Sequence, residues 1–416
     1  MLEHVRIASD PCPKLVARTI CRLSFVSLSE SFHAETGEFE SQGAELSQYT
    51  SVIRSKAGLQ PRHSKDERGL RGRELVRSGP RVRNEAGGAL TIRPLENHII
   101  KQDSVMGLLS SFASPKNVQV YALPTGWVHL PDKWLFEDGD DDIMKARSRF
   151  PDYSFLICNP SGKNILFDAG MPKDFDVIPP LNRSIDHIFE PYVPKDARDL
   201  LSEGPISPDS LSAIVLSHIH FDHIGDPSTF PNIPYITGPG TKEAALPAYP
   251  TNPNSTMLGS LLDRDNYTEL SWTKDRWTEL GPFSHVHDFF GDGSFFIVDT
   301  PGHLPGHVIG LAQTKPDEWV ILGGDCCHHR ALLNGSRQVS LTGCPGGTSM
   351  HTDTAVAIKS IEKLRELDQD ETVFVALSHD ASLEGKMPEY PQCLNGWRES
   401  AWWDSMRRER MQSTAA

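Results

Sequence analysis

The chain of 416 residues has no apolar run of about 18–20 residues, so its sequence offers no membrane-spanning helix. Its N-terminus lacks a basic stretch followed by an apolar run and a small-residue cleavage site, so no secretory signal is expected. The seven cysteines are odd in number and irregularly spaced, so they do not imply a disulfide framework. A reducing, cytoplasmic location is therefore the default expectation.

An excess of positive charge is also missing. The chain carries 41 Lys and Arg against 55 Asp and Glu, for a net charge of −14. Because a nucleic-acid-binding protein needs a basic surface, neither DNA nor RNA is an expected partner. The G-x-S-x-G elbow of the α/β-hydrolases is absent as well, which argues against a covalent serine mechanism.

Residues 1–115 differ in composition from the rest of the chain. They contain no Trp and have 16 Lys and Arg against 13 Asp and Glu, so the remainder carries a net charge of −17. Such a composition buries too little apolar surface to offset the entropy of ordering. We expect a disordered or poorly ordered N-terminal extension at 1–115 and a catalytic domain at 116–416. The extension is either a regulatory or targeting segment, or an artefact of a true start at Met106.

From residue 117 onward, the pattern predicts strands with interleaved helices. Strands are expected at 118–123, 153–158, 164–168, 211–216, 294–298, 308–312, 319–322 and 372–377. Pro124 is expected to end the first of them. Helices are expected near 194–202 and from about Thr354 to Leu367, where apolar residues recur every three or four positions. This order favours a layered α/β domain.

One segment, H-x-H-x-D-H at residues 218–223, places four metal-binding side chains within six residues, directly after the strand expected at 211–216. Imidazole nitrogen and carboxylate oxygen bind zinc at about 2.0–2.2 Å. Later strands are also followed by such groups, namely His303, Asp325 and His379. Because loops at strand ends present functional groups from a rigid scaffold, these residues are candidates for one site. Five His and two Asp suit two zinc ions that share a carboxylate.

The motifs H-x-H-x-D-H, T-P-G-H-x-P-G-H, G-G-D and S-H-D follow one another at 218–223, 300–307, 323–325 and 378–380. In this order they resemble those of the metallo-β-lactamase superfamily, over about residues 117–400. Within the superfamily they are similar to the N-acyl-homoserine lactonase-like branch. The resemblance implies a metallo-β-lactamase-like αββα sandwich, in which two mixed sheets are flanked by helices.

The resemblance also implies how two zinc ions per chain are held. Motif position assigns His218, His220 and His303 to the first zinc, Asp222, His223 and His379 to the second, and Asp325 to both. His307 is expected to support the ligands without binding metal, and Asp168 to brace the His-rich loop. Cys326 and Cys327 are expected to be small buried residues beside the site.

The chain departs from the lactonase-like pattern three residues after the bridging Asp. Members of the branch often carry a Tyr there, facing the substrate carbonyl, whereas this chain has His328. Because a His can also donate to a developing oxyanion, His328 is a catalytic candidate. Asp222 is the second, as the shuttle of a proton to the leaving atom. Because His328 stands where related proteins often have Tyr, the sequence does not decide which type of ring the substrate carries.

We therefore expect a dinuclear zinc hydrolase that opens a lactone or a lactam by attack of a metal-bridging hydroxide. The alternative is thioesterase or glyoxalase-type hydrolysis of a thioester. An iron-bearing oxidising member is disfavoured by the lack of a recognisable flavin domain, and a non-catalytic binding protein by the complete ligand set. The expected partner is a small molecule with a hydrolysable carbonyl.

The aromatic and aliphatic residues at 126–152 and 244–293 are expected either to line the substrate pocket or to pack the domain. Three tryptophans near the C-terminus have two possible roles: they either pack a final helix or form a homodimer contact. They are Trp397, Trp402 and Trp403.

Overall fold

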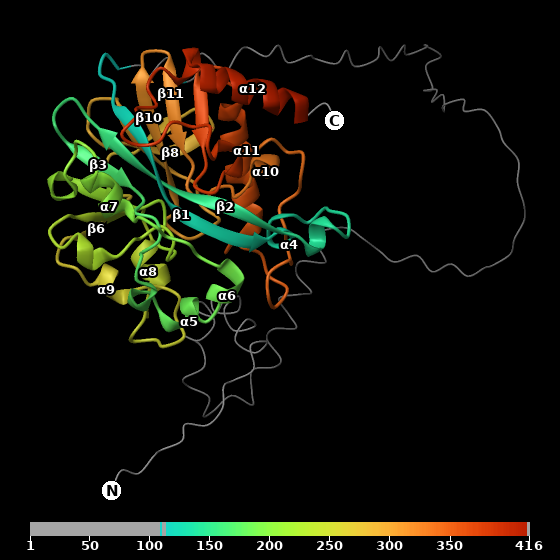
Figure 1. Ribbon diagram of the computed structural model, residues 1–416. Coiled ribbons are helices and arrows are strands. Elements are labelled where there is room, and N and C mark those ends of the chain that lie inside the picture. The colour runs from blue at the N-terminus through green and yellow to red at the C-terminus, as the bar shows by residue number, and fades with distance from the viewer. Residues whose placement is uncertain (1–108, 110–113, 414–416) are drawn as a thin grey trace, which may run out of the picture. The chain divides into compact units, whose positions relative to one another are not determined.

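The computed structural model describes residue 109 and residues 114–413 and contains two six-stranded sheets (Figure 1). The extension expected at 1–115 lies almost entirely outside the described residues. At its boundary, the backbone N–H of Ser114 donates to Gln313 Oε1 at 2.8 Å, and Gln313 Nε2 donates to the Ser114 carbonyl at 3.0 Å. The contacts of the folded domain therefore begin no later than Ser114.

The first sheet has the strand order β1-β2-β3-β4-β5-β6. Its strands are β1 (Gln119–Pro131), β2 (Arg147–Cys158), β3 (Asn164–Phe167), β4 (Ala213–Val215), β5 (Tyr235–Thr237) and β6 (Tyr267–Glu269). β1 to β3 pair antiparallel, and β3 to β6 pair parallel. The expectation that Pro124 ends the first strand is wrong. The register shifts between Pro124 and Gly126, and because this edge strand tolerates a proline at a bulge, β1 continues to Pro131.

The second sheet has the order β12-β11-β10-β9-β8-β7. Its strands are β7 (Thr278–Leu280), β8 (Phe283–Asp288), β9 (Phe295–Asp299), β10 (Val308–Lys315), β11 (Glu318–Leu322) and β12 (Val373–Ala376). Only the β11–β12 pair is parallel within this sheet of the described chain. The strands predicted from the sequence are all present, but β1 extends well beyond its expected end at 123 and β2 begins well before its expected start at 153. β5 to β8 are additional strands that the sequence analysis did not predict.

Helices flank the two sheets. They are α4 (Asp132–Leu135), α5 (Pro180–Arg183), α6 (Asp186–Phe189), α7 (Ala197–Ser202), α8 (Thr241–Ala245), α9 (Gly259–Leu262), α10 (Arg330–Leu333), α11 (Thr354–Asp368) and α12 (Ala401–Ser413). Single 3₁₀ turns lie at Ile143–Lys145, Phe175–Val177, Pro208–Ser210, Pro227–Thr229, Ala381–Leu383 and Trp397–Glu399. The long helix expected from Thr354 is confirmed. It begins where the Asp353 side chain accepts a hydrogen bond from the Val356 N–H, which caps its first turn.

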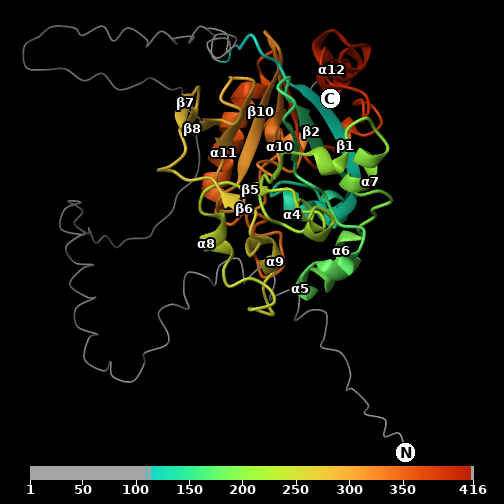
Figure 2. The ribbon, with the colours of Figure 1, turned by 90° about the vertical axis from the view of Figure 1, so that its left-hand side faces the viewer.

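Strand alternation divides the core into layers. In β11, Val320 belongs to the cluster that also contains Phe167 of β3, so this cluster lies between the two sheets. The neighbouring residue Ile321 packs in another cluster with Ile361 of α11. Leu166 of β3 belongs to a third cluster, with Leu201 of α7. Helix, sheet, sheet and helix are thus stacked in the expected αββα order, with α11 over the second sheet (Figure 2).

The three C-terminal tryptophans pack the end of the chain onto the domain. Trp397 and Trp403 are buried, with ring centroids 5.7 and 5.2 Å from that of Phe374 in β12. Trp402 lies 5.5 Å from the same ring. The first of the two interpretations, packing of the final helix α12, is therefore confirmed. Within the described part of the chain, no helix is long and apolar enough to cross a membrane.

Candidate metal centre

Four loops that follow strands bring the candidate ligands together. Residues 217–223 follow β4, and His303, Asp325 and His379 follow β9, β11 and β12. Backbone hydrogen bonds hold these loops together. The Ser378 N–H donates to the Gly324 carbonyl at 3.4 Å, and the N–H of Val308, which follows the His303 loop, donates to the Ser217 carbonyl at 2.8 Å. The C-terminal ends of strands from both sheets therefore meet at one edge of the sandwich. Loops at such an edge are held by a rigid scaffold and can present functional groups.

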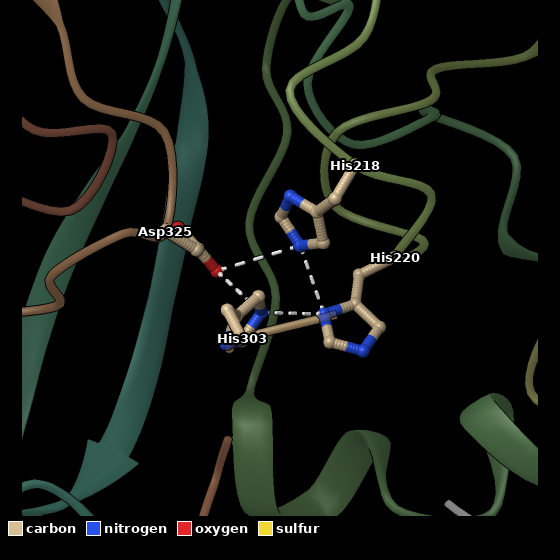
Figure 3. A group of neighbouring side chains, drawn as sticks. All are labelled: His218, His220, His303 and Asp325. Carbon is tan, nitrogen blue, oxygen red and sulfur yellow. Dashed lines mark hydrogen bonds and ion pairs between the residues drawn. The ribbon is translucent and has the colours of Figure 1, made fainter. Parts of the chain in front are cut away.

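The first group consists of His218, His220 and His303. His220 Nδ1 lies 2.9 Å from His218 Nε2 and 3.0 Å from His303 Nε2. Figure 3 shows the three rings and the Asp325 carboxylate turned toward one another, with His218 and His220 on one loop and His303 and Asp325 on two others. Together these four side chains form a cluster that can hold a metal ion.

The second group consists of Asp222, His223 and His379. Asp222 Oδ1 lies 3.9 Å from His223 Nε2, and its Oδ2 lies 3.7 Å from His379 Nε2. Asp222 is partly exposed, whereas both histidines are fully buried. These three residues form a separate cluster that can also hold a metal ion.

Asp325 contacts both groups. Its Oδ2 lies 3.5 Å from His303 Nε2 in the first group and 3.4 Å from His223 Nε2 in the second. Its Oδ1 lies 3.4 Å from His379 Nε2. The carboxylate therefore stands between the two groups, in the position required of a bridging ligand.

The outward-facing Nδ1 atoms of the two histidines in the second group are fixed by hydrogen bonds. His223 Nδ1–H donates to Asp168 Oδ2 at 3.0 Å, and His379 Nδ1–H donates to the Pro151 carbonyl at 2.9 Å. Asp168 also accepts the Ser217 backbone N–H at 2.6 Å and the Ser217 hydroxyl at 2.8 Å. Asp168 thus braces the His-rich loop, as the sequence predicted. Each Nε2 is left free to face the interior of the site.

His307 lies behind Asp325 and does not join either group. Its Nε2 accepts the backbone N–H of Asp325 at 3.1 Å, so its proton is on Nδ1, 2.9 Å from Thr300 Oγ1. Burial lowers the pKa of His307 to about 3, which keeps the ring neutral for this bond. The expectation that His307 supports a ligand agrees with these contacts.

His351 is a buried partner of the first group that the sequence analysis missed. Its Nδ1 lies 3.3 Å from His303 Nδ1, on the side of the His303 ring opposite the site. The backbone next to His351 also contacts the His303 loop, since the Thr352 N–H donates to the His303 carbonyl at 2.9 Å. Gly302 allows the start of α11 to pack closely against this loop: its φ is +125°, and a Cβ there would lie 2.2 Å from the Ala357 nitrogen.

The two groups differ in their electrostatics. Burial and the neighbouring rings hold the pKa values of His218 and His303 well below the usual range, and burial lowers the pKa of His220 to about 4. Burial also opposes the charged form of His223. There, however, the carboxylates of Asp325, Asp168 and Asp222 outweigh burial and raise the pKa well above the usual value. The pKa of His379 is also raised, because the carboxylates of Asp325, Asp222 and Asp152 outweigh its burial.

The residues present fit a pair of bound cations. Within residues 114–413, His223 Nε2 and Asp325 Oδ1 are buried without a hydrogen-bond partner, although both face the site. In the first group, His218 Nδ1–H donates to Ser217 Oγ at 3.0 Å. The Nε2 atom of this ring therefore carries a lone pair, which points toward His220. Converging lone pairs and carboxylate oxygens are the donor set expected of a transition-metal site.

A cavity of about 140 Å³ opens beside the two groups. Its polar part includes the partly exposed His220 and Asp222, together with His328. Its apolar lining consists of Val128, Leu130, Trp134, Ile185, Phe189, Phe221 and Met350. A second cavity, of about 450 Å³, shares Trp134 and Cys344 with the first. The arrangement suits a small ligand with an apolar body and one reactive polar group.

The stretches 126–152 and 244–293, both candidates for substrate contacts, differ in how much of the cavity they line. The stretch 126–152 contributes Val128, Leu130 and Trp134 to the cavity, whereas 244–293 contributes only Thr256 among its described lining. Trp272 and Trp277 instead pack against each other, with ring centroids 4.9 Å apart. For most of the second stretch, therefore, the packing interpretation holds.

The two cysteines after Asp325 are buried in the core cluster, as expected. Burial raises the pKa of both thiols, to about 12 for Cys327. Such thiols are inert small core residues rather than nucleophiles.

A two-sheet sandwich with clustered His and Asp at its strand ends is the architecture of a metal-dependent hydrolase. The chain belongs to the metallo-β-lactamase superfamily, whose family model matches residues 147–376. The metallo-hydrolase mfmC of Annulohypoxylon moriforme is 33% identical over 325 residues, which are 69% of this chain and 85% of that protein. Both the superfamily and the αββα fold inferred from the motifs are therefore confirmed.

Other similarities extend the comparison. The gamma-lactamase FDB1 of Fusarium pseudograminearum is 30% identical over 61% of this chain and 72% of that protein. The cytochrome P450 monooxygenase mpaDE' of Penicillium brevicompactum is 38% identical over 60% of this chain, but this chain spans only 32% of that protein. A crystal structure of a quorum-quenching N-acyl homoserine lactone lactonase shares the fold, with a TM-score of 0.50 at 22% identity, covering 67% of this chain and 99% of that chain.

Proposed function

We propose that the chain is a dinuclear zinc hydrolase that opens a lactone or lactam ring. The observation that carries this proposal is the convergence of two ligand groups on the single carboxylate of Asp325, beside an apolar cavity. Two metals that share a carboxylate are the arrangement that two-metal hydrolases use. Family membership and relatives named as lactamases and a metallo-hydrolase support hydrolysis as the reaction class.

The first group with Asp325 would hold one zinc, and the second group with Asp325 would hold the other. When bound, the pair supplies a hydroxide nucleophile at neutral pH and a Lewis acid for the carbonyl oxygen. Neutral imidazoles suit the first zinc, and the additional carboxylate of Asp222 suits the second. His307 would keep the Asp325 backbone in register, and Asp168 would keep His223 in the tautomer whose Nε2 is free.

His328 is placed to stabilise charge that develops on the carbonyl oxygen. It is buried at the cavity wall, and its Nε2 makes no hydrogen bond within the described chain although Asp325 Oδ2 is 3.2 Å away. An N–H at this atom can therefore turn to the oxyanion. Asp222, partly exposed at the same wall, can carry the proton to the leaving oxygen or nitrogen.

A hydrolysis panel tests the proposal. The zinc-loaded full chain is assayed with an N-acyl homoserine lactone, dihydrocoumarin, a fused-ring γ-lactam and the thioester S-lactoylglutathione. We expect kcat/KM for a cyclic ester or amide to exceed that for the thioester by at least about tenfold, since ring and thioester differ in how they fill the apolar cavity. Hydrolysis of the thioester alone would overturn the proposal in favour of the glyoxalase-type alternative.

Two variants of one residue sharpen the panel. His328→Phe removes the donor but keeps a ring, and it should lower kcat by about 10²- to 10³-fold. His328→Tyr restores a donor and should recover most of that loss. Equal activity of the two variants would show that His328 does not donate to the oxyanion.

A further inference from the structure

The second cavity, of about 450 Å³, lies next to the cavity that contains the metal-binding groups. Trp134 of α4 and Cys344 line both cavities. α6 also serves both, because its Phe189 lines the first cavity and its His187 and Ile188 line the second. α4 and α6 lie side by side (Figure 1, Figure 2), with the ring centroids of Trp134 and Phe189 5.9 Å apart. The two cavities are therefore neighbours that share a wall.

The wall of the second cavity is basic, although the domain around it is acidic. Lys133, Arg147 and His187 line it, and all three residues are exposed. Its described lining contains no Asp or Glu. Because the basic residues are exposed rather than buried, a ligand that enters from solvent can reach them. A cavity lined by one sign of charge concentrates ligands of the opposite sign.

Arg147 is fixed in this wall and keeps donors to spare. One of its terminal nitrogens donates to the Ile188 carbonyl, and the other donates to Glu190 Oε1 at 2.8 Å. A guanidinium has five N–H groups, so three of them have no acceptor within the described chain. The Glu190 carboxylate offsets the charge of Arg147. What the guanidinium still offers is a set of N–H groups held in a fixed direction.

Lys133 supplies a charge that no carboxylate offsets. Its side chain makes no ion pair or hydrogen bond with any residue of 114–413, whereas its carbonyl accepts the Ser340 hydroxyl at 2.8 Å. Lys145, on the same connection between β1 and β2, differs because its Nζ lies 3.4 Å from Asp141 Oδ2. An unpaired cation beside unused N–H donors is the combination that binds an anionic group by charge-assisted hydrogen bonds.

The rest of the lining is apolar. Pro131, Trp134, Ile188 and Pro345 cover the remaining wall together with the Gly343–Cys344 backbone turn. A bare inorganic anion would leave this apolar surface without a partner. An organic anion, with its charge on a carbon body, satisfies both parts of the wall.

We propose that the second cavity binds a carboxylate that the substrate carries on an apolar arm, while the lactone or lactam ring lies in the first cavity. This inference rests on the proposed function, because it names the substrate class of the same metal centre. Lys133 supplies the charge and Arg147 the directed donors. Since the carboxylate binds away from the metals, its contacts are the same in the ground state and the transition state. They lower KM and leave kcat unchanged.

Two matched ligand pairs test the inference on the zinc-loaded full chain. The first pair is a γ-butyrolactone whose alkyl arm ends in a carboxylate and the same lactone with the primary amide at that end. The second pair, phenylhexanoate and phenylhexanamide, contains no ring that can be opened. Hydrolysis gives KM and kcat for the lactones, and calorimetry gives dissociation constants for the second pair. The members of each pair differ in one negative charge.

We expect the carboxylate member of each pair to show a KM or Kd at least about fivefold lower than its amide, with equal kcat for the two lactones. Lys133→Gln should bring the ratio close to one, and Lys133→Arg should keep it. The control Lys145→Gln removes an equal charge outside the cavity and should leave the ratio unchanged. Added salt should reduce the ratio, because it screens exposed charges.

Three outcomes would overturn the inference: equal binding of acid and amide, a preference that is as large in Lys133→Gln as in the wild type, or a preference expressed in kcat. The second of these would mean that the carboxylate binds the zinc ions instead. The two pairs also separate this inference from the proposed function. If neither lactone is opened but phenylhexanoate shows the Lys133-dependent preference, the reaction class is wrong and the anion-binding cavity stands. If both lactones are opened equally well, the cavity assignment alone fails.

Discussion

The two ligand groups that meet at Asp325 are built differently. The first group is three imidazoles whose pKa values lie below the usual range, so they are neutral without metal. The second group pairs two histidines with carboxylates, and the pKa values of His223 and His379 are raised. In the metal-free chain the histidines of the second group therefore favour the doubly protonated imidazolium, whereas those of the first group are neutral and carry one N–H each. Metal binding would have to displace this additional proton in the second group only.

Their outer partners differ as well. In the second group the outer nitrogens of His223 and His379 face the Asp168 carboxylate and the Pro151 carbonyl, which only accept hydrogen bonds. In the first group His303 faces His351, and His218 faces the Ser217 hydroxyl. The second group is thus anchored by strong acceptors, and the first by weaker, two-way partners. The carboxylate of Asp325 therefore contacts two candidate metal-binding groups whose outer hydrogen-bond partners differ, so we expect the two groups to respond differently to substitution and to pH.

Removing the shared carboxylate should have the largest effect. Asp325→Ala takes an oxygen ligand from both groups, so metal content should fall from about two ions per chain to fewer than one, and kcat/KM by at least about 10³-fold. His307→Ala, which removes no candidate metal ligand but loses the bonds to the Asp325 N–H and to Thr300, should cost about tenfold. Metal analysis and hydrolysis rates check both, and an equal loss in the two variants would mean that His307 is itself a ligand.

Variants that disable one group at a time should separate the sites. His220→Ala and His379→Ala should each lower the metal content by about one ion per chain, with kcat reduced by about 10²-fold or more because both metals serve the same carbonyl. Metal analysis after dialysis gives the stoichiometry. If either variant loses both ions, the two groups form one cooperative site, and the prediction that they bind metal separately is wrong.

The partner of His303 should affect the first group only. His351→Phe removes the acceptor for the His303 Nδ1–H and should weaken the first metal by about 10- to 100-fold. His351→Gln, which keeps an acceptor, should recover much of that affinity. Competition with a chelating dye measures each metal separately in the His379→Ala and His220→Ala backgrounds. A loss confined to the second metal would contradict the contact assigned to His351.

Acidification should release the second metal first. From about pH 8 to about pH 5.5, a span that brackets the ordinary imidazole pKa, protons compete for His223 and His379, whose pKa values are raised. His220, with a pKa of about 4, stays neutral over the same span. The His379→Ala variant should therefore keep its one metal at the lower pH, and His220→Ala should lose it. The reverse order of loss would show that the charge difference between the groups is misassigned.

Much of the fold, and which residues gather at the candidate metal centre, could be predicted from the sequence. Strands such as β11 and β12 are largely apolar, and the candidate ligands lie in the loops that follow such strands. The short strands β5 to β7 were missed because three residues carry no readable period. Pro124 misled the prediction of the first strand, because a bulge at a sheet edge is a tertiary solution that no local pattern reveals.

One supporting residue, His351, could not be predicted for a different reason. It lies 48 positions from His303, the candidate ligand that it contacts, with no motif around it. Its role depends on which atoms come together after folding. Asp168 was predicted because it directly follows a strand, and the resemblance already gave it a place beside the His-rich loop.

The most direct test of the two-site account is the metal content of the purified full chain during titration with a chelator, followed together with lactone or lactam hydrolysis. We predict two zinc ions per chain, two separable steps of metal loss with the second group emptied first, and full loss of hydrolysis that added zinc reverses. A single metal ion per chain, bound iron, or hydrolysis that persists after complete chelation would contradict the account.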